Sequence, residues 1–266
     1  KNSSTIVYNL SILSLIIILV LNFNLFNFKE TLLFSNGYSI DALSTFMKFL
    51  VLISGILVML SSSKYLKISK IFKIEYPVLL LSSILGMMIM ISSNDLIVFY
   101  MGLELQSLAL YVLASFNRDN QLSSESGLKY FVLSALSSGL LLYGCSLIYG
   151  YSGSTNFLVI SQNISEVKYG LTLGIVFILV GLAFKISAVP FHMWAPDVYQ
   201  GSPTSVTVFF AILPKIAAIT VFIRFLYIPF INLMDQWQTI IIFLSIASMV
   251  FGAVAAIGQK NLKRLM

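Results

Sequence analysis

Four ionisable residues lie inside strongly apolar segments of this sequence, where a charge is least expected. They are Glu104, Lys129, Lys185 and Lys215. A charged side chain at the centre of a membrane costs about 2.5 kcal/mol or more, so such residues normally face the interior of a helical bundle and mark a path for ions or protons. The alternatives for each are a structural ion pair or a side chain that extends to the membrane surface. One acid and three bases at these positions predict proton transfer.

Glu104 lies in the middle of its apolar segment, nine residues from one end and twelve from the other. It cannot reach either membrane surface from there, and on a helix Ser107 and Tyr111 share its face. Lys129 lies about two helical turns into the next segment, so extension to the surface remains open for it. Because the loop between the two segments is short, their helices are expected to be antiparallel neighbours. A Glu104–Lys129 ion pair is therefore possible.

Two prolines lie close to the other two lysines. Lys185 ends a long uncharged run, and Pro190 follows it by five residues. A proline lacks the backbone N–H, so in a helix Pro190 leaves the carbonyl of Ile186 without its partner. Lys215 directly follows Pro214, and the same argument applies there. A lysine beside a broken helix is typical of transport sites in membranes, and a buried lysine can exchange its proton near neutral pH. We therefore expect a proton site at Lys185.

Five further residues allow only less specific functional interpretations. His192 is the only histidine, and its type suits a proton relay, although a structural role at a kinked helix is equally open. Asp197 is expected in a loop or at a helix cap, and Arg224 is expected to extend to the membrane surface. Lys48 has no evident partner in the sequence. Cys145 is the only cysteine, is interpreted as a small packing residue, and excludes an internal disulfide or a four-cysteine cluster.

The composition fixes the class of protein. Of 266 residues, 58 % are hydrophobic and 10 % are charged, whereas soluble domains carry about 25 % charged residues. Continuous apolar runs of about 20 residues predict transmembrane helices, so we expect an all-α, polytopic membrane bundle. Eight spans are predicted, at 5–25, 38–62, 77–93, 95–116, 126–150, 171–204 (interrupted), 205–228 and 236–258.

The net charge of +6 is interpreted as a topology signal rather than as a nucleic-acid surface. If 171–204 is one broken crossing, nine cations fall on one side and two on the other, which predicts that the first side is the cytoplasm or mitochondrial matrix. The nine are Lys1, Lys64, Lys67, Lys70, Lys73, Arg118, Lys260, Lys263 and Arg264, and the two are Lys29 and Lys168.

Several stretches resemble subunit 2 of respiratory complex I, the proton-pumping NADH:ubiquinone oxidoreductase. They are "SSNDLIVFYMGLELQSLALYVLASF", "ESGLKYFVLSALSSGLLLYGCSLIYG", "GLAFKISAVPFHMWAPDVYQGSPTSVTVFF", "PKIA" and "GQKNLKRLM". The resemblance implies the antiporter-like fold, in which two inverted five-helix repeats each contain a discontinuous helix. By that likeness 1–76 are N-terminal helices, 77–228 form the first repeat with its break around 186–204, and 229–266 open a second repeat. It also implies that a partial or split chain is present, completed by a second chain.

The same resemblance implies roles and partners. Glu104, Lys129, Lys185, Lys215 and His192 match family positions that transfer protons. This chain is expected to hold no cofactor, while NAD, FMN, iron–sulfur clusters and ubiquinone are expected in other subunits. Expected partners are other complex I membrane subunits, including antiporter-like neighbours, and lipids such as cardiolipin. The expected location is the mitochondrial inner membrane, or alternatively the bacterial plasma membrane. A subunit of a multi-subunit cation/proton antiporter and a non-pumping structural subunit remain the alternative functions.

Overall fold

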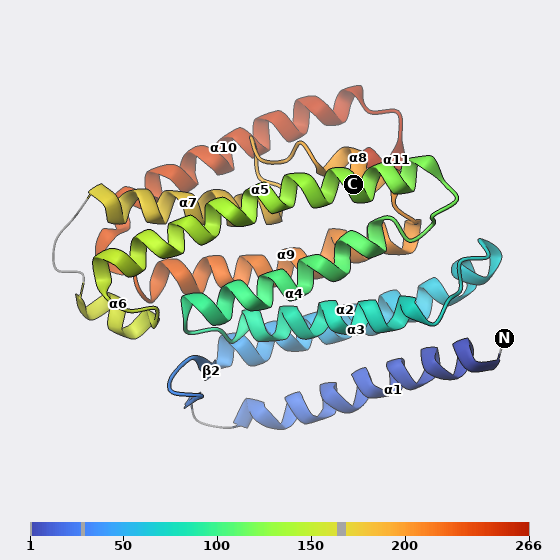
Figure 1. The fold of residues 1–266 in the computed structure, drawn as a ribbon, viewed down its shortest axis with the longest axis horizontal. Helices are drawn as coiled ribbons and strands as arrows, with labels where there is room; N and C mark the ends of the chain where they lie inside the picture. Colours follow the sequence, from blue (N-terminus) through green and yellow to red (C-terminus); the bar gives the residue numbers. More distant parts are fainter. Residues whose placement is uncertain (1, 28–29, 164–168, 266) are drawn as a thin grey trace.

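The computed structural model describes residues 2–27, 30–163 and 169–265, so the predictions that involve Lys1, Lys29 and Lys168 lie outside the described residues. In these ranges the protein is an elongated bundle of long helices (Figure 1). The long helices are α1 (Asn2–Asn24), α2 (Ala42–Ile68), α3 (Glu75–Ile91), α4 (Leu96–Ala114), α5 (Gln121–Ser152), α7 (Tyr169–Ile186), α9 (Thr204–Tyr227) and α10 (Met234–Gly258). The short elements are η1 (Leu25–Asn27), β1 (Thr31–Leu33), β2 (Tyr38–Ile40), α6 (Phe157–Asn163), α8 (Ala195–Gly201), η2 (Ile231–Leu233) and α11 (Leu262–Leu265).

The predicted spans correspond one by one to these long helices. Within the described ranges, seven helices are long and apolar enough to cross a membrane, and α3 is an eighth apolar helix of 17 residues. The protein is therefore a multi-pass membrane protein with an all-α bundle. The sequence did not predict the antiparallel hairpin of β1 and β2, nor the short helices α6 and α11. These elements are too short to produce a clear apolar period.

Local polar residues mark where three of the long helices begin. Asp41 precedes α2 and its carboxylate accepts from the backbone N–H of Ser44, while the Ser44 hydroxyl accepts from the N–H of Asp41. Asp95 caps α4 by accepting from the backbone N–H groups of Ile97 and Val98, and Asn120 caps α5 by accepting from that of Leu122. Such caps satisfy N–H groups that the first turn of a helix leaves free. They therefore stabilise the first turns of α2, α4 and α5.

Glycines allow the helices around the polar centre to approach closely. A Cβ on Gly86 of α3 would lie 2.5 Å from the backbone nitrogen of Gln106 and 2.8 Å from the carbonyl oxygen of Gly102, both on α4. Between α5 and α7, a Cβ on Gly144 would lie 2.7 Å from the carbonyl oxygen of Gly174. Small residues at crossings are the usual means by which membrane helices pack. The pairs α3–α4 and α5–α7 are therefore held in fixed registers.

The predicted break in the sixth span is present, although its form differs from the expectation. Helix α7 ends at Ile186, four residues before Pro190, and Ser187 follows in the left-handed region with φ of 61°. The proline therefore does not remove a hydrogen bond inside a continuing helix. Instead the indole Nε1 of Trp194 donates to the carbonyl of Phe184 at 2.9 Å, and the chain re-enters helix at α8. Pro214, by contrast, lies inside α9 as predicted.

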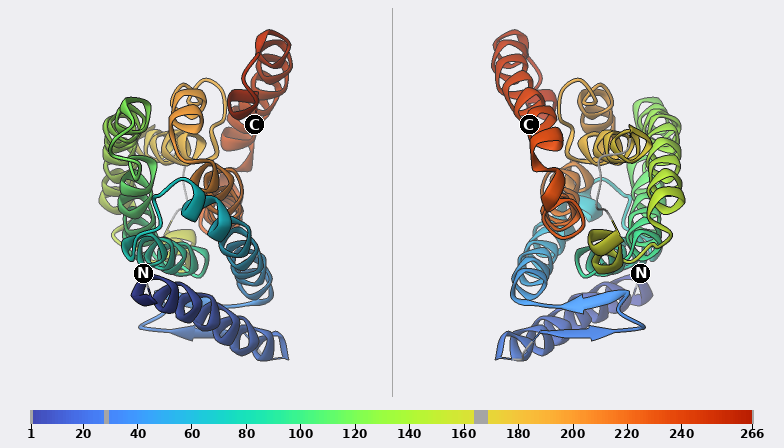
Figure 2. Two further views of the ribbon diagram at one scale, coloured as in Figure 1. Left: turned by 90° about the vertical axis from the view of Figure 1, so that its right-hand side faces the viewer. Right: turned by 90° about the vertical axis from the view of Figure 1, so that its left-hand side faces the viewer.

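The connections alternate between the two ends of the bundle. The α2–α3, α4–α5 and α10–α11 connections, which carry Lys70, Lys73, Arg118 and Lys260, lie at the right-hand end of Figure 1. The β hairpin and α6 lie at the opposite end (Figure 1). Figure 2 shows α1 and α10 at opposite edges of the bundle, with α4, α5, α7 and α9 between them. The polar residues that the sequence singled out are carried mainly by this inner group.

Candidate functional site

Lys185 is the most deeply buried of the predicted proton-site residues. It lies in the last turn of α7, is 5 % exposed, and its ammonium donates to the hydroxyl of Ser107 at 2.8 Å and to that of Ser134 at 2.6 Å. The two serines belong to α4 and α5. Tyr111 of α4 donates its own hydroxyl to Ser134 at 2.6 Å. The sequence placed Ser107 and Tyr111 on the polar face of α4, but it did not identify Ser134.

Glu104 lies on the same side of α4 as this hydroxyl cluster. It is half-buried, its Oε1 atom is buried without a hydrogen-bond partner among the described residues, and its charge interacts with that of Lys185. No carboxylate in the described part of the chain lies within ion-pair distance of Lys185. Lys185 is therefore a buried cation whose direct partners are neutral hydroxyls.

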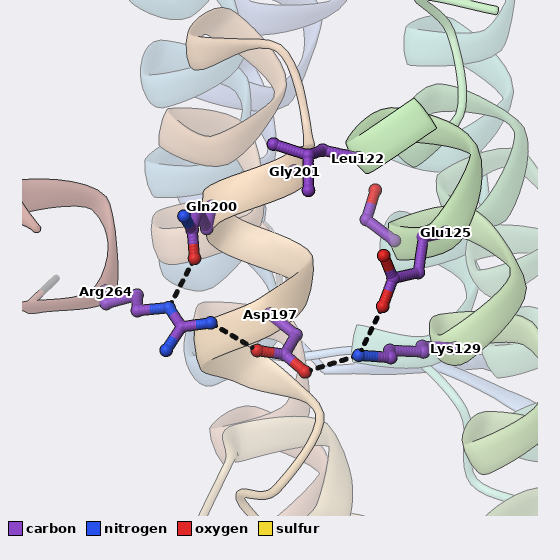
Figure 3. Close-up of a pocket in the computed structure, with 8 residues that line it drawn as sticks. Leu122, Glu125, Lys129, Asp197, Gln200, Gly201 and Arg264 are labelled. Atoms are coloured by element: carbon purple, nitrogen blue, oxygen red, sulfur yellow. Dashed lines mark hydrogen bonds and ion pairs between the residues drawn. The ribbon is translucent and has the colours of Figure 1, made fainter. Parts of the chain in front are cut away.

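Lys129 has quite different surroundings, shown in Figure 3. Its ammonium lies 2.7 Å from Glu125 on its own helix and 2.7 Å from Asp197 on α8, and its side chain is 40 % exposed. Asp197 also binds the guanidinium of Arg264 at 2.8 Å, and Arg264 reaches Gln200 as well. These residues line a small cavity of about 150 Å³ between α5 and α8. The cluster joins three helices through alternating charges.

The predicted Glu104–Lys129 ion pair is therefore wrong. The bond between Tyr111 and Ser134 sets the register of the antiparallel helices α4 and α5, so Glu104, two turns from Tyr111, lies level with residues near Leu141 rather than with Lys129. Asp197 is likewise not the loop or capping residue expected. It lies in the first turn of α8 and its carboxylate is a tertiary ion-pair partner.

Lys215 and His192 line one cavity of about 510 Å³ between the broken helix and α10. Lys215 lies 5.6 Å from the centre of the Tyr199 ring on α8, and His192 packs 4.6 Å from the Phe251 ring on α10. The Nδ1 atom of His192 is buried without a partner in the described residues. Lys215 and His192 therefore line the same cavity. Neither of them is among the hydrogen-bond partners of Lys185.

Arg224 contradicts its predicted extension to the membrane surface. Its side chain is 1 % exposed, and its guanidinium makes two hydrogen bonds to Asp41, at 2.8 and 2.7 Å, and a third to the hydroxyl of Ser39. Burial raises the pKa of the Asp41 carboxyl, but the charge of Arg224 and hydrogen bonds from Ser44 more than offset this, so that pKa lies below its ordinary value. A fixed fork of donors matched to a carboxylate is typical of structural arginine pairs.

Lys48, which had no evident partner in the sequence, is also buried. It is 4 % exposed and donates to the Tyr38 hydroxyl at 2.8 Å. Tyr38 belongs to the hairpin that the sequence did not predict, which explains why the contact was missed.

Within the described ranges, no group of three or more His, Cys, Asp and Glu side chains gathers as metal ligands would.

Comparison with known proteins identifies the fold. A family model described as "NADH:quinone oxidoreductase/Mrp antiporter, TM" matches residues 93–266. Subunit N of NADH-quinone oxidoreductase from Pelagibacter ubique is 73 % identical over 266 residues, covering 100 % of this chain and 56 % of that protein. The chain spans about half the length of the curated relatives that it matches.

Solved structures have the same architecture. A chain of respiratory complex I from Thermus thermophilus superimposes with a TM-score of 0.84 and 31 % identity, covering 98 % of this chain and 55 % of that one. A chain of the Mrp complex from Dietzia gives 0.86 at 19 % identity, with 98 % and 51 % covered, a likeness of fold alone. The predicted antiporter-like fold is confirmed, and this chain belongs to the NADH:quinone oxidoreductase/Mrp antiporter transmembrane family.

Proposed function

We propose that this chain is a proton-translocating membrane subunit of an NADH-quinone oxidoreductase, and that it couples electron transfer elsewhere in the complex to proton movement. The observation that carries the proposal is the buried ammonium of Lys185, held by hydroxyls with no carboxylate of the described residues in direct contact. A charge so placed in a membrane bundle is costly and is retained chiefly where it moves ions or protons. Relatives named as NADH-quinone oxidoreductase subunits support this assignment.

The identity of the subunit and its location belong to the same proposal. The relatives are bacterial and carry the designation subunit N, the homologue of the subunit 2 that the sequence resembles. We therefore favour the bacterial plasma membrane over the mitochondrial inner membrane. Partnership with other membrane subunits is part of the proposal. The predicted lipids, a completing second chain, and cofactors confined to other subunits remain predictions, as do the repeat boundaries and the proton-transfer roles of the five site residues.

The test is NADH-driven proton pumping by the intact complex in sealed vesicles, with Lys185→Ala compared against wild type. We expect pumping and NADH oxidation to fall together by at least about tenfold, because a proton site in series with the redox reaction limits both. The matched control is Lys64→Ala, which removes an exposed lysine near the end of α2. Co-purification with the other subunits establishes that the variant complex is assembled.

Two outcomes would support the alternatives. Unchanged pumping in a fully assembled Lys185→Ala complex would favour a non-pumping structural subunit. Failure of the chain to purify with any NADH-oxidising activity, together with proton exchange driven by a cation gradient, would favour a multi-subunit antiporter. The antiporter alternative is retained for a specific reason, because the description of the matching family includes Mrp antiporters.

A further inference from the structure

We propose that Ser134 is a positioning residue whose hydroxyl serves Lys185 in both of its protonation states, as acceptor from the ammonium and as donor to the neutral amine. The inference rests on the proposed function, because it assumes that Lys185 gains and releases protons. It concerns a residue that no feature of the sequence singled out. Four side chains carry the argument, namely Lys185, Ser107, Ser134 and Tyr111.

Ser107 can serve only one state without losing a bond. Its hydroxyl donates to the carbonyl of Leu103 at 2.6 Å, one turn earlier in α4, and it accepts from Lys185. A hydroxyl has a single hydrogen and two lone pairs. The hydrogen of Ser107 is therefore committed to the backbone, and the residue faces Lys185 as an acceptor.

Ser134 has its hydrogen available. Its oxygen accepts from Lys185 and from Tyr111, both at 2.6 Å, which occupies the two lone pairs. Among the described residues, Ser134 donates no hydrogen bond. It is completely buried, so its O–H cannot turn to bulk water. Tyr111 keeps the oxygen in place and leaves the hydrogen free to rotate.

Loss of a proton from Lys185 changes which hydrogen bonds are possible. One N–H bond breaks and its proton passes to a neighbouring base, either a water molecule or a carboxylate, while the bonding electron pair stays on the nitrogen as a lone pair. Ser134 then rotates its O–H toward this lone pair, while Tyr111 continues to donate to the serine oxygen. No bond within the serine breaks. A carboxylate in this position could only accept, and would leave the neutral amine without a donor.

Among the described residues, the other titratable groups that interact with Lys185 come from α4. Glu104 interacts with it through charge, and the Tyr111 ring lies 5.9 Å from its ammonium. From α5, the only hydrogen-bond partner among the described residues is Ser134. The variants must therefore leave Glu104 and Tyr111 unchanged.

The experiment measures NADH-driven pumping by the intact complex from pH 6 to 9 with Ser134→Ala and Ser134→Thr. Alanine removes the hydroxyl, whereas threonine retains it. We expect Ser134→Ala to lose about tenfold in rate at the wild-type optimum and to shift that optimum by about one pH unit, and Ser134→Thr to stay within about twofold. The control is Ser152→Ala, which removes a buried hydroxyl of the same helix that donates only to main-chain carbonyls.

The outcomes distinguish the role of Ser134 from the proposed function of the chain. A Ser134→Ala profile that coincides with those of wild type and Ser152→Ala would overturn the inference. If Ser134→Ala fails to assemble, Ser134→Cys, which keeps the size but is a weak donor, takes its place with the same expectation. Normal pumping by Lys185→Ala would refute the proposed function itself. Loss of pumping in Lys185→Ala with an unaltered Ser134→Ala would refute only the role of Ser134.

Discussion

Lys185 and Lys129 were predicted to do the same chemistry, yet their surroundings differ in two respects. Lys185 is buried and its direct partners are hydroxyls from two other helices. Lys129 is 40 % exposed and lies between two carboxylates. A carboxylate only accepts hydrogen bonds and always favours the cation, whereas a hydroxyl can bond either form of an amine. We propose that the type of partner, as well as depth, separates a lysine able to exchange protons from one held in its charged form.

Arg224 separates the effect of burial from the effect of the partner. It is as buried as Lys185, but its partner is a carboxylate, like those of Lys129. A guanidinium stays protonated under all ordinary conditions. We therefore interpret the Arg224–Asp41 pair as structural, joining the end of α9 to the start of α2. A buried guanidinium paired with a carboxylate therefore keeps its charge and serves to join the two helices.

The largest effect is expected from Asp41→Asn, which tests this interpretation of Arg224. The substitution leaves a buried guanidinium without its counter-charge, and breaking a buried ion pair in this way typically costs about 3–5 kcal/mol. The thermal stability of the purified complex should fall, while pumping per assembled complex should stay close to wild type. Asp119→Asn, in the exposed α4–α5 connection, is the control. Loss of pumping with unchanged stability would place Arg224 among the transport residues.

The same pair has a defined pH dependence. Because the pKa of Asp41 is lowered in the folded protein, its stabilising contribution is complete above the unfolded-state pKa of about 3.9 and is lost as the pH falls through the folded-state value. The stability difference between wild type and Asp41→Asn should therefore be constant from pH 8 to 5 and shrink below about pH 4. Melting curves of both complexes across this range measure it. A difference that disappeared between pH 8 and 6 would implicate another group.

A smaller effect is expected when Lys185 is given a carboxylate as its direct partner, as Lys129 has. Ser134→Asp places an acceptor-only group beside the ammonium, and pumping should fall by about tenfold, equivalent to about 1.4 kcal/mol in the rate-limiting barrier. Ser134→Asn has nearly the same size without the charge and should lose less. The measurement is NADH-driven pumping per assembled complex. Equal losses in the two variants would show that side-chain volume matters and that partner charge does not.

The sequence was sufficient for the spans and for the depth of the key charges. Apolar runs predicted the long helices because each must satisfy its own backbone in a membrane. The depth of Glu104 and Lys185 followed from their distance to the polar ends of their segments.

Partners were harder to predict than positions, because they depend on how helices are set against one another. Ser134 could not be paired with Lys185 without the register of α4 against α5. Asp41 and Arg224 are 183 residues apart, and Arg224 alone looked like a residue near a membrane surface. Lys48 needed Tyr38, which comes from a hairpin too short to predict. The Glu104–Lys129 ion pair, inferred from adjacent helices, failed for the same reason.

The smallest effect is expected from Asp197→Asn, which removes one of the two carboxylates of Lys129 and the partner of Arg264. Exposed ion pairs contribute little, and Glu125 remains beside Lys129, so pumping should stay within about twofold of wild type. Any difference should shrink further at high salt, because mobile ions screen exposed charges. Pumping measured at low and high ionic strength, with Asp235→Asn in the first turn of α10 as control, checks both points. If Asp197→Asn instead abolished transport at every salt concentration, a carboxylate-bound lysine would be essential to proton movement, and partner type could no longer separate the two sites.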